Sequence, residues 1–369
     1  MESSHLKLTP LDELFLQRAY ELAARGVGST APNPPVGAVV VRDEQLVGEG
    51  YHRRAGDAHA ESIAIAQAGT RARGATLYIS LEPCRHFGRT PPCTRTLIEA
   101  GVARVVAGTL DPTEHGGAAQ LREHGIDVVV AGDAAARDLI EIFAGSILRD
   151  RPYVALKMAM SLDGVVASRS GVCERIGSAA QERYVRELRT VFDAVMVGAG
   201  TVRIDDPALT VRPPHDRDRP YVRVIACQRE PLSGESRLFT SIPDGYVKTI
   251  VLVPAGSRDR FAALRDVAEV LDIGPSDAAS LDLAEAMKAL RAHGIAGVLC
   301  EGGPRLGASL LAAGLVDRVY WAIAPRFCNV GEGVPVLSGA DLNGVRVRFD
   351  RIESAGPDIV LSGTVCSAE

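Results

Sequence analysis

Strand-like apolar runs alternate with amphipathic helical segments along nearly the whole chain. In the first half, the runs at 75–81 and 102–110 each precede a helical pattern, and the alternation resumes from residue 153. Strands that alternate with helices build a mostly parallel sheet with helices on both faces. The pattern therefore predicts an α/β fold in both halves of the chain.

A charged segment that contains a proline divides the two halves. One helix is predicted over 134–148, and "LRDRP" follows at its end before the next strand-like run. Such segments are typical of domain boundaries, and 369 residues suffice for about two domains. We expect one domain over residues 1–149 and a second over 150–369.

The composition indicates a globular protein with a small-molecule partner. A formal net charge of −5 gives no attraction for nucleic acid, and no apolar run is long enough to cross a membrane. The N-terminus has no export signal, so a cytoplasmic location is expected. Seven cysteines are too few and too sparse for a disulfide framework.

Two short stretches, "DAHAESIA" at 57–64 and "SLEPCRHFGRTPPC" at 80–93, bring together the ligands of a catalytic zinc. His59, Cys84 and Cys93 supply three ligands, and a catalytic site leaves its fourth position to water. Glu61 stands at the start of a predicted helix, where it can pass protons to a leaving amine. Nucleobase deaminases use this chemistry.

Other interpretations of these residues stay open. Taken singly, His59, Cys84 and Cys93 would more often be ordinary core residues, and only their combination favours zinc. A deaminase of RNA or single-stranded DNA would need a basic groove and aromatic platforms, which 5% aromatics do not favour. A noncatalytic zinc-stabilised binding module would have no use for Glu61.

The loop between the two cysteines carries positive charge. Eight residues separate Cys84 from Cys93, and they include Arg85, His86 and Arg89. We expect these side chains near the metal, where a cationic loop suits a phosphorylated substrate.

Several segments closely resemble the bifunctional deaminase–reductases of riboflavin biosynthesis, and the resemblance covers nearly the whole chain. The segments of the first half are "APNPPVGAVVV", "VGEGYHRRAGDAHAE" and "LYISLEPCRHFGRTPPC". Those of the second half are "LKMAMSLDG", "VGAGTVRIDDPALTVR" and "EGGPRLGASLLAAGLVD". The resemblance implies a cytidine-deaminase-like domain followed by a dihydrofolate-reductase-like domain.

The resemblance also implies the reactions. A diaminopyrimidinone that carries a ribosylamino phosphate is hydrolytically deaminated with zinc, and NADPH then reduces the ribosyl group to ribityl. The matching positions for substrate in the deaminase half are Asn33, His52, Arg89 and Asp111. Those in the reductase half are Arg189, Leu209, Arg212 and Glu301, with Lys157 as a further substrate-side position. The matching NADPH positions are Ala159, Thr201, Asp205, Gly303, Pro304, Arg305, Leu306 and Gly307, within a segment that extends to residue 309.

The residues themselves support some of these roles. Asn33 lies between two prolines, which restrict its backbone, and its amide can both donate to and accept from a pyrimidine edge. The stretch "EGGPRLGASLL" predicts a helix start of the kind that binds anions, although simple turn chemistry would give the same pattern. For proton delivery during reduction we expect either Lys157 or a water held by Asp205.

The chain departs from the family pattern mainly in its second half. Cys173, Arg175 and Gly177 stand where the family has Ser, Trp and Thr, Cys227 replaces an Asp, and Thr113 replaces an Asn. The alternative hypothesis is therefore a deaminase paralogue with weak or lost reduction, which serves a pyrimidine-derived secondary metabolite. An exposed sheet edge in the second half also predicts a homo-oligomer.

Overall fold

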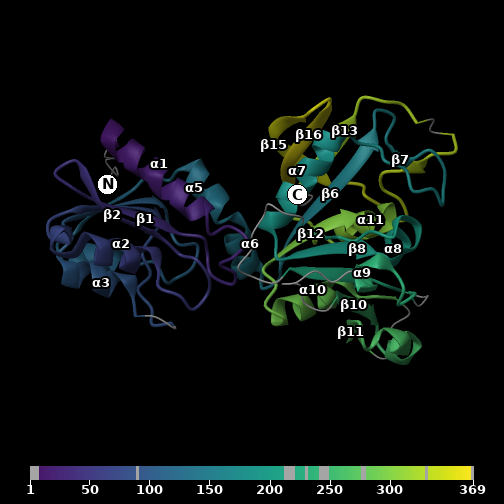
Figure 1. The fold of residues 1–369 in the computed structure, drawn as a ribbon, viewed down its shortest axis with the longest axis horizontal. Coiled ribbons are helices and arrows are strands. Elements are labelled where there is room, and N and C mark those ends of the chain that lie inside the picture. The colour runs from purple at the N-terminus through teal and green to yellow at the C-terminus, as the bar shows by residue number, and fades with distance from the viewer. Residues whose placement is uncertain are drawn as a thin grey trace. The chain divides into compact units, whose positions relative to one another are not determined.

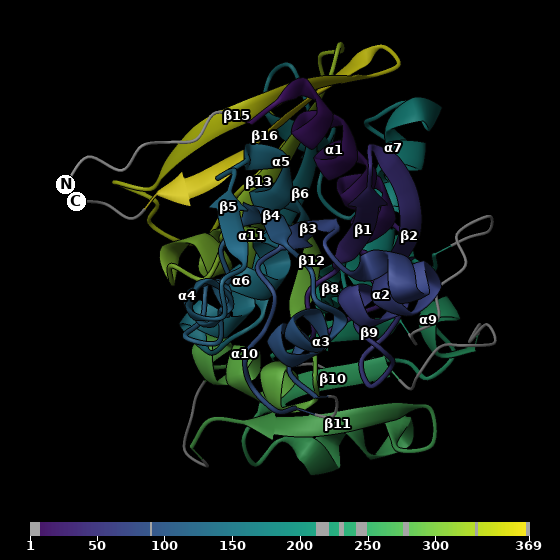
Figure 2. The same ribbon diagram turned by 90° about the vertical axis from the view of Figure 1, so that its left-hand side faces the viewer.

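The computed structural model describes residues 8–88, 91–211, 221–228, 232–240, 249–275, 280–328 and 331–366. The chain divides into two compact units, Met1–Leu148 and Arg149–Glu369. Each unit contains its own sheet (Figures 1 and 2). Within the part of the chain that is described, every helix is too short or too polar to span a bilayer.

The first unit is a five-stranded sheet with helices on both faces (Figure 2). Its strand order is β2-β1-β3-β4-β5. The strands are β1 (Gly37–Arg42), β2 (Gln45–Tyr51), β3 (Thr76–Leu81), β4 (Arg104–Thr109) and β5 (Asp127–Val130). The helices are α1 (Pro10–Ala24), α2 (Ala60–Ala68), the 3-10 helix η1 (Gly69–Ala72), α3 (Cys93–Ala100), α4 (Ala118–Glu123), α5 (Ala134–Leu139) and α6 (Glu141–Arg149).

Alternate residues of β1 explain the two layers of helices. Ala38 and Val40 belong to one apolar core with residues of α2, α3 and α4, and Val39 and Val41 belong to a second core with residues of α1 and α5. Successive side chains of a strand point to opposite faces, so one strand serves both cores. The sheet thereby places the starts of α2 and α3 on the same face.

Two expectations for the first unit were wrong. The sheet is not mostly parallel, because β1 pairs antiparallel with both β2 and β3, while β3, β4 and β5 are parallel. Only Asp43 and Glu44, both with positive φ, connect β1 to β2, and so short a connection permits only a hairpin. The single helix expected over 134–148 is broken at Ile140, whose φ and ψ are −103° and 8°.

The second unit contains a nine-stranded sheet of order β11-β10-β9-β8-β12-β6-β13-β16-β15 and a two-stranded sheet, β14-β7. The strands are β6 (Tyr153–Ser161), β7 (Val165–Ala167), β8 (Ala194–Gly198), β9 (Val222–Ala226), β10 (Thr249–Pro254), β11 (Ala268–Ile273), β12 (Gly297–Gly302), β13 (Arg318–Ala324), β14 (Val334–Pro335), β15 (Arg346–Ala355) and β16 (Asp358–Cys366). The helices are α7 (Ala179–Val191), α8 (Ala199–Asp205), α9 (Arg237–Thr240), η2 (Arg258–Leu264), α10 (Leu283–Ala292) and α11 (Pro304–Ala312).

The large sheet is mostly parallel, as the alternation predicts. β12 lies between β8 and β6 and is parallel to both, so the carboxyl ends of these three strands meet at one edge of the sheet. Open α/β sheets bind ligands at such an edge. The antiparallel hairpin of β15 and β16, which completes the sheet beside β13 (Figure 1), was not anticipated from the sequence.

Candidate functional site

The three expected zinc ligands converge in the first unit. His59 is the N-cap of α2, Cys93 is the first residue of α3, and Cys84 follows β3. His59 Nδ1 lies 3.2 Å from Cys93 Sγ and 3.8 Å from Cys84 Sγ, and the three atoms are all within 4.8 Å of one another. The backbone holds Cys84 in place, because its carbonyl accepts a hydrogen bond from Thr94 N at 3.2 Å.

The pKa shifts of this cluster reflect the direct contacts among its three side chains. The hydrogen bond with Cys93 lowers the pKa of Cys84 to about 4, and the same hydrogen bond raises the pKa of Cys93. The hydrogen bond with Cys84 raises the pKa of His59. The N-terminal ends of α2 and α3 add positive potential, which stabilises thiolate. Two sulfurs and one imidazole within this distance fit zinc and leave a position for water.

Glu61 lies beside the cluster and is almost completely buried, with 3% of its surface exposed. Its carboxyl group hydrogen-bonds Cys93, and burial, followed by the charge on Cys84, raises its pKa. A carboxyl group whose pKa is raised exchanges its proton more readily near neutral pH. The expected proton shuttle thus lies within reach of the expected metal ligands.

A cavity of about 410 Å³ opens onto these residues. Its walls include Asn33, His52 and Asp111, three of the expected substrate positions, together with His59, Glu61 and Cys84. Phe143 and Ile147 of α6 add an apolar side. The cavity is large enough for a small polar ligand.

Asn33 and His52 form an ordered pair in the wall of this cavity. His52 Nδ1 lies 3.1 Å from the carbonyl oxygen of Ala58, which can only accept, so Nδ1 carries the proton. Nε2 is then an acceptor for the Asn33 amide nitrogen at 3.1 Å. His52 is only 2% exposed, and both its ring nitrogens bond to protein atoms. The pair fixes which way the Asn33 amide faces.

Asp111 is held by the loop in which it lies. Its Oδ1 accepts hydrogen bonds from the backbone nitrogen and the hydroxyl of Thr113, at 2.8 and 2.7 Å. Its backbone nitrogen donates to Glu82 Oε2 at 3.0 Å, and Glu82 Oε1 accepts from Ala118 N at 2.7 Å. The buried Glu82 therefore shapes the loop around Asp111, a role that the sequence reasoning missed.

In the loop between the two cysteines, His86 and Arg85 have different surroundings. His86 lines the cavity, and its ring lies 4.4 Å from that of His115, which also lines the cavity and was missed from the sequence. The Arg85 guanidinium donates instead to the Glu114 carbonyl at 2.8 Å, and Arg85 is not among the residues that line the cavity. Arg89 lies outside the described residues.

In the second unit, the expected NADPH positions gather at the edge where β6, β8 and β12 end. Ala159 lies near the end of β6, Thr201 lies in α8, and Gly303 is the N-cap of α11. Thr201 Oγ1 lies 3.4 Å from the Gly302 carbonyl, and Gly303 has φ +84°, a conformation that favours glycine. Pro304, Arg305, Leu306 and Gly307 begin α11.

Three expected substrate-side residues form a charged group in the second unit. Arg189 bonds both carboxylate oxygens of Glu301, with Nη2–Oε2 at 2.7 Å, and donates to the Thr210 carbonyl at 3.1 Å. Burial would raise the pKa of Glu301, but the Arg189 cation outweighs it and the pKa is lowered. Burial lowers the pKa of Lys157, although the Glu301 charge opposes this effect.

The other expected substrate-side positions are less informative. Leu209 is 4% exposed and packs in an apolar core, so its side chain has a structural role. Arg212 lies outside the described residues.

The positions that depart from the family pattern have local partners. The Cys173 thiol hydrogen-bonds the carboxylate of Asp205, the last residue of α8. Arg175 Nε pairs with Glu182 Oε1 at 2.7 Å. A Cβ atom at Gly177 would lie 1.6 Å from Gln181 Oε1, so the Gln181 side chain occupies the space beside this glycine.

Two family models match the chain in order. Residues 9–109 match the cytidine and deoxycytidylate deaminase zinc-binding region, and residues 152–361 match the RibD C-terminal domain. The matches agree with the expected cytidine-deaminase-like domain followed by a dihydrofolate-reductase-like domain.

The relatives align over nearly their full lengths. The riboflavin biosynthesis protein RibD of Aquifex aeolicus is 38% identical over 357 residues, which cover 95% of this chain and 98% of the relative. That of Escherichia coli is 36% identical over 370 residues, with the same coverage.

Two solved structures are similar to this chain over nearly its full length. A diaminohydroxyphosphoribosylaminopyrimidine deaminase/5-amino-6-(5-phosphoribosylamino)uracil reductase from Thermotoga maritima is 35% identical with a TM-score of 0.83, covering 96% of this chain and 99% of that chain. Acinetobacter baumannii RibD is 33% identical with a TM-score of 0.82, covering 97% and 99%. These matches do not favour a paralogue that has lost reduction.

Both halves of the chain therefore match one bifunctional architecture. A zinc-dependent deaminase is joined to an NADPH-dependent reductase, and the chain belongs to the RibD family of riboflavin biosynthesis.

Proposed function

We propose that the first unit deaminates a diaminopyrimidinone that carries a ribosylamino phosphate, and that the second unit reduces the ribosyl group of the product to ribityl. The observation that carries the proposal is the convergence of His59, Cys84 and Cys93 beside the buried Glu61, where His59, Cys84 and Glu61 line one cavity. The likeness to relatives with this pair of activities supports it.

In the deaminase cavity, His59, Cys84 and Cys93 would hold zinc, which when bound supplies Lewis-acid activation of water. Glu61 would pass one proton of the attacking water to the exocyclic amine, which leaves as ammonia, and the other to the adjacent ring nitrogen, so that the carbon ends as a carbonyl. The burial that raises the pKa of Glu61 suits both halves of this transfer.

Asn33 and Asp111 are the groups that we propose to bind the pyrimidine. The hydrogen bond from Asn33 to His52 leaves the Asn33 Oδ1 and one amide hydrogen available to a ring edge. His52 then acts through Asn33 as a positioning residue. For the phosphate we propose His86 and Arg89, since both belong to the cationic loop between the cysteines.

In the reductase, Ala159, Thr201, Asp205 and the start of α11 would hold NADPH, which would supply a hydride to the sugar carbonyl. Lys157 would then give a proton to the developing alkoxide. Burial lowers the pKa of Lys157, so its ammonium group releases a proton more easily than an exposed lysine does. Near Lys157, the ion pair between Arg189 and Glu301 fixes the positions of both side chains for substrate binding.

The location of the protein and its partners are also proposals. None of the seven cysteines, all of which the structure describes, is in a disulfide, which supports a reducing compartment such as the cytoplasm. β15 bears exposed Phe349 and Ile352, which supports a homo-oligomer. The acidic net charge supports the proposal that the protein does not bind nucleic acid. Sedimentation of the purified protein that gives only a monomer would remove the oligomer proposal.

The central experiment supplies the purified protein with the diaminopyrimidinone ribosylamino phosphate, first without and then with NADPH. Without NADPH, mass spectrometry should show one amino group replaced by oxygen. With NADPH, the product should gain two hydrogens while NADPH absorbance falls. A substrate that returns unchanged in both samples would refute the proposed function.

A further inference from the structure

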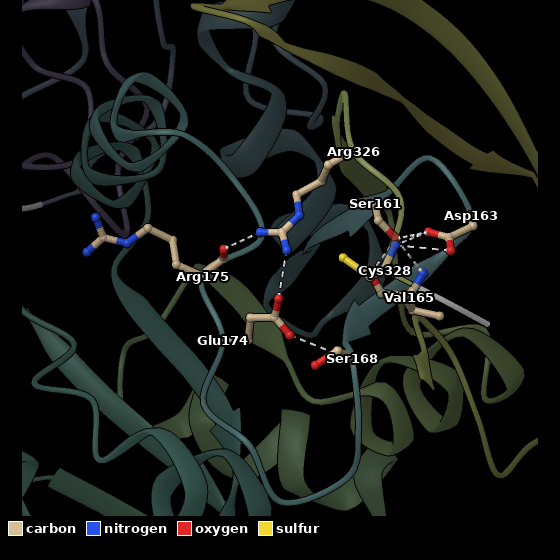
Figure 3. A network of polar contacts seen from close by, with 8 residues as sticks. All are labelled: Ser161, Asp163, Val165, Ser168, Glu174, Arg175, Arg326 and Cys328. Carbon is tan, nitrogen blue, oxygen red and sulfur yellow. Dashed lines mark hydrogen bonds and ion pairs between the residues drawn. The ribbon is translucent and has the colours of Figure 1, made fainter. Parts of the chain in front are cut away.

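The segment 168–177 connects β7 to α7 without regular structure, and the Glu174 side chain within it uses both of its carboxylate oxygens. Glu174 Oε2 accepts from Ser168 N at 2.8 Å, which closes the segment on itself. Glu174 Oε1 accepts from Arg326 Nη2 at 2.8 Å, and Arg326 Nη1 donates to the Arg175 carbonyl at 3.2 Å (Figure 3). Arg326 thus binds two consecutive residues of the segment.

Arg326 is itself part of a rigid base. Its carbonyl accepts from Leu162 N at 2.8 Å, and its own backbone nitrogen donates to Ala324 at the end of β13. Two residues further on, Cys328 N lies 3.1 Å from both carboxylate oxygens of Asp163 (Figure 3). Because β6 and β13 are paired in the sheet, the residues after each strand anchor one another.

The neighbours of Glu174 contact two helices, of which α8 carries two of the expected NADPH positions. Cys173 hydrogen-bonds Asp205 at the end of α8, and Arg175 pairs with Glu182 of α7. In Figure 3 the Arg175 side chain extends away from Arg326, while Glu174 faces Arg326. Ile176 is buried against Val165 and Cys328, so apolar packing also holds the segment in place.

If a segment at a binding site is already ordered before the ligand binds, its ordering does not reduce the affinity for the ligand. The Glu174–Arg326 ion pair has one hydrogen bond at 2.8 Å, and the same guanidinium also donates to the Arg175 carbonyl. Because the Arg326 side chain is 45% exposed and that of Glu174 is 21% exposed, the pair stabilises the segment by the modest amount of a surface ion pair. It is the contact that ties the Cys173 end of the segment to the base formed by β6 and β13.

We propose that Glu174 and Arg326 are positioning residues of the reductase, which hold the 168–177 segment so that Cys173 remains on Asp205 at the NADPH site. The inference rests on the proposed placement of NADPH at this edge of the sheet. Neither residue touches the reacting atoms, so both act through the segment.

The test compares Glu174→Gln, Arg326→Gln and the double variant with the parent protein. The dissociation constant of NADPH, measured by fluorescence, should rise roughly two- to five-fold in each single variant and no further in the double variant. The kcat of reduction at saturating NADPH should change little, and the deaminase rate of the same preparation should be unchanged. Arg326→Lys, which keeps the charge, should recover part of the affinity.

A second measurement does not depend on NADPH. Loss of the ion pair should let Cys173 leave Asp205, so its alkylation by a maleimide, followed on the peptide that contains Cys173, should become several-fold faster. Glu285→Gln is the matched control, because it breaks the exposed Glu285–Lys288 pair on α10 and should alter neither readout.

The outcomes separate this inference from the proposed function. A parent protein that neither binds nor oxidises NADPH would remove the proposed reductase. A parent that binds NADPH normally, together with Glu174 and Arg326 variants that match it in NADPH affinity and in Cys173 alkylation, would overturn the positioning role alone. Equal loss of deaminase and NADPH binding would also overturn it, because it would indicate general unfolding.

Discussion

His52 Nε2 lies 3.1 Å from the amide nitrogen of Asn33, and the opposite ring nitrogen of His52 is fixed on the Ala58 carbonyl. The imidazole therefore determines the orientation of an amide that we propose to read the pyrimidine. His52→Phe keeps a ring in the same space but loses both hydrogen bonds. Deaminase kcat/KM should fall about tenfold, because the Asn33 amide loses the one hydrogen bond that orients it. Unchanged kinetics would show that Asn33 needs no such support.

Replacement of Glu61, the buried carboxyl group beside the metal ligands, should strongly slow deamination without loss of zinc. In Glu61→Gln, the rate should fall by about 10² to 10⁴, the range for a lost general acid–base, while zinc content stays at parent level. Steady-state assays with metal analysis check both. A Glu61→Gln protein that deaminates at the parent rate would remove Glu61 from the mechanism.

Metal removal should separate the two activities. Metal analysis of the parent should give about one zinc per chain, because the described residues contain one cluster of suitable ligands, His59, Cys84 and Cys93. Cys84→Ser or a strong chelator should abolish zinc and deamination together, and reduction of an already deaminated substrate should continue. Deamination by the zinc-free protein would contradict this assignment.

Lys157→Met should affect only reduction. The buried ammonium group is the proposed proton donor, so its loss should lower the kcat of reduction by about a hundredfold or more. NADPH binding, measured by fluorescence, and deamination should remain. If Lys157→Met reduces the sugar at the parent rate, the proton comes from another group, such as a water held by Asp205.

A buried ion pair should make the free energy of unfolding of the first unit depend on pH in the acidic range. Asp12 is 1% exposed and bonds Arg104 at 2.7 Å and the Tyr78 hydroxyl at 2.9 Å. Burial would raise the pKa of Asp12, but the Arg104 hydrogen bond and others outweigh it and lower the pKa to about 2. A lowered carboxyl pKa stabilises the fold above the ordinary value of 3.8, and this stability is lost as pH falls toward about 2.

The matching experiment uses Asp12→Asn. At pH 7 it should lower the free energy of unfolding by about 2 kcal/mol, and the difference from the parent should shrink as pH falls from about 4 toward 2. Denaturant melts at several pH values measure both effects. A difference that is constant over this range would show that the Asp12 charge does not contribute.

Gly177 and Gln181 should behave as a coupled pair. Gly177→Thr would bring a Cβ atom onto Gln181 Oε1, and such overpacking costs about 1 to 3 kcal/mol. Gly177→Thr should therefore lower the melting temperature, and adding Gln181→Ala should restore it. Gln181→Ala alone is the control. Equal melting temperatures for the parent and Gly177→Thr would mean that Gln181 moves aside without cost.

Much of the fold was predictable because local patterns agree with it. The run 153–161 and the run 268–273 are strands with the expected bounds, since each is an apolar stretch of strand length. The β15–β16 hairpin was missed because β15 is mostly exposed and carries charges, so no buried pattern marks it. The break at Ile140 had no glycine or proline to indicate it.

The candidate site was predictable to the extent that its residues are close in sequence or carry distinctive chemistry. Spacing and residue type placed His59, Cys84 and Cys93 together, whereas His115 and Phe143 enter the cavity through tertiary packing that no local motif encodes. Arg85 has the right charge, but its guanidinium is taken by the Glu114 carbonyl. Charge in a loop does not determine which way a side chain turns.

The contact between positions 177 and 181 also limits how this sequence can change over time. A side chain at 177 fits only if the end of the Gln181 side chain moves or is removed, so the residue at 181 sets the cost of every replacement at 177. The tolerance of position 177 to change is therefore decided by its neighbour on the first turn of the following helix.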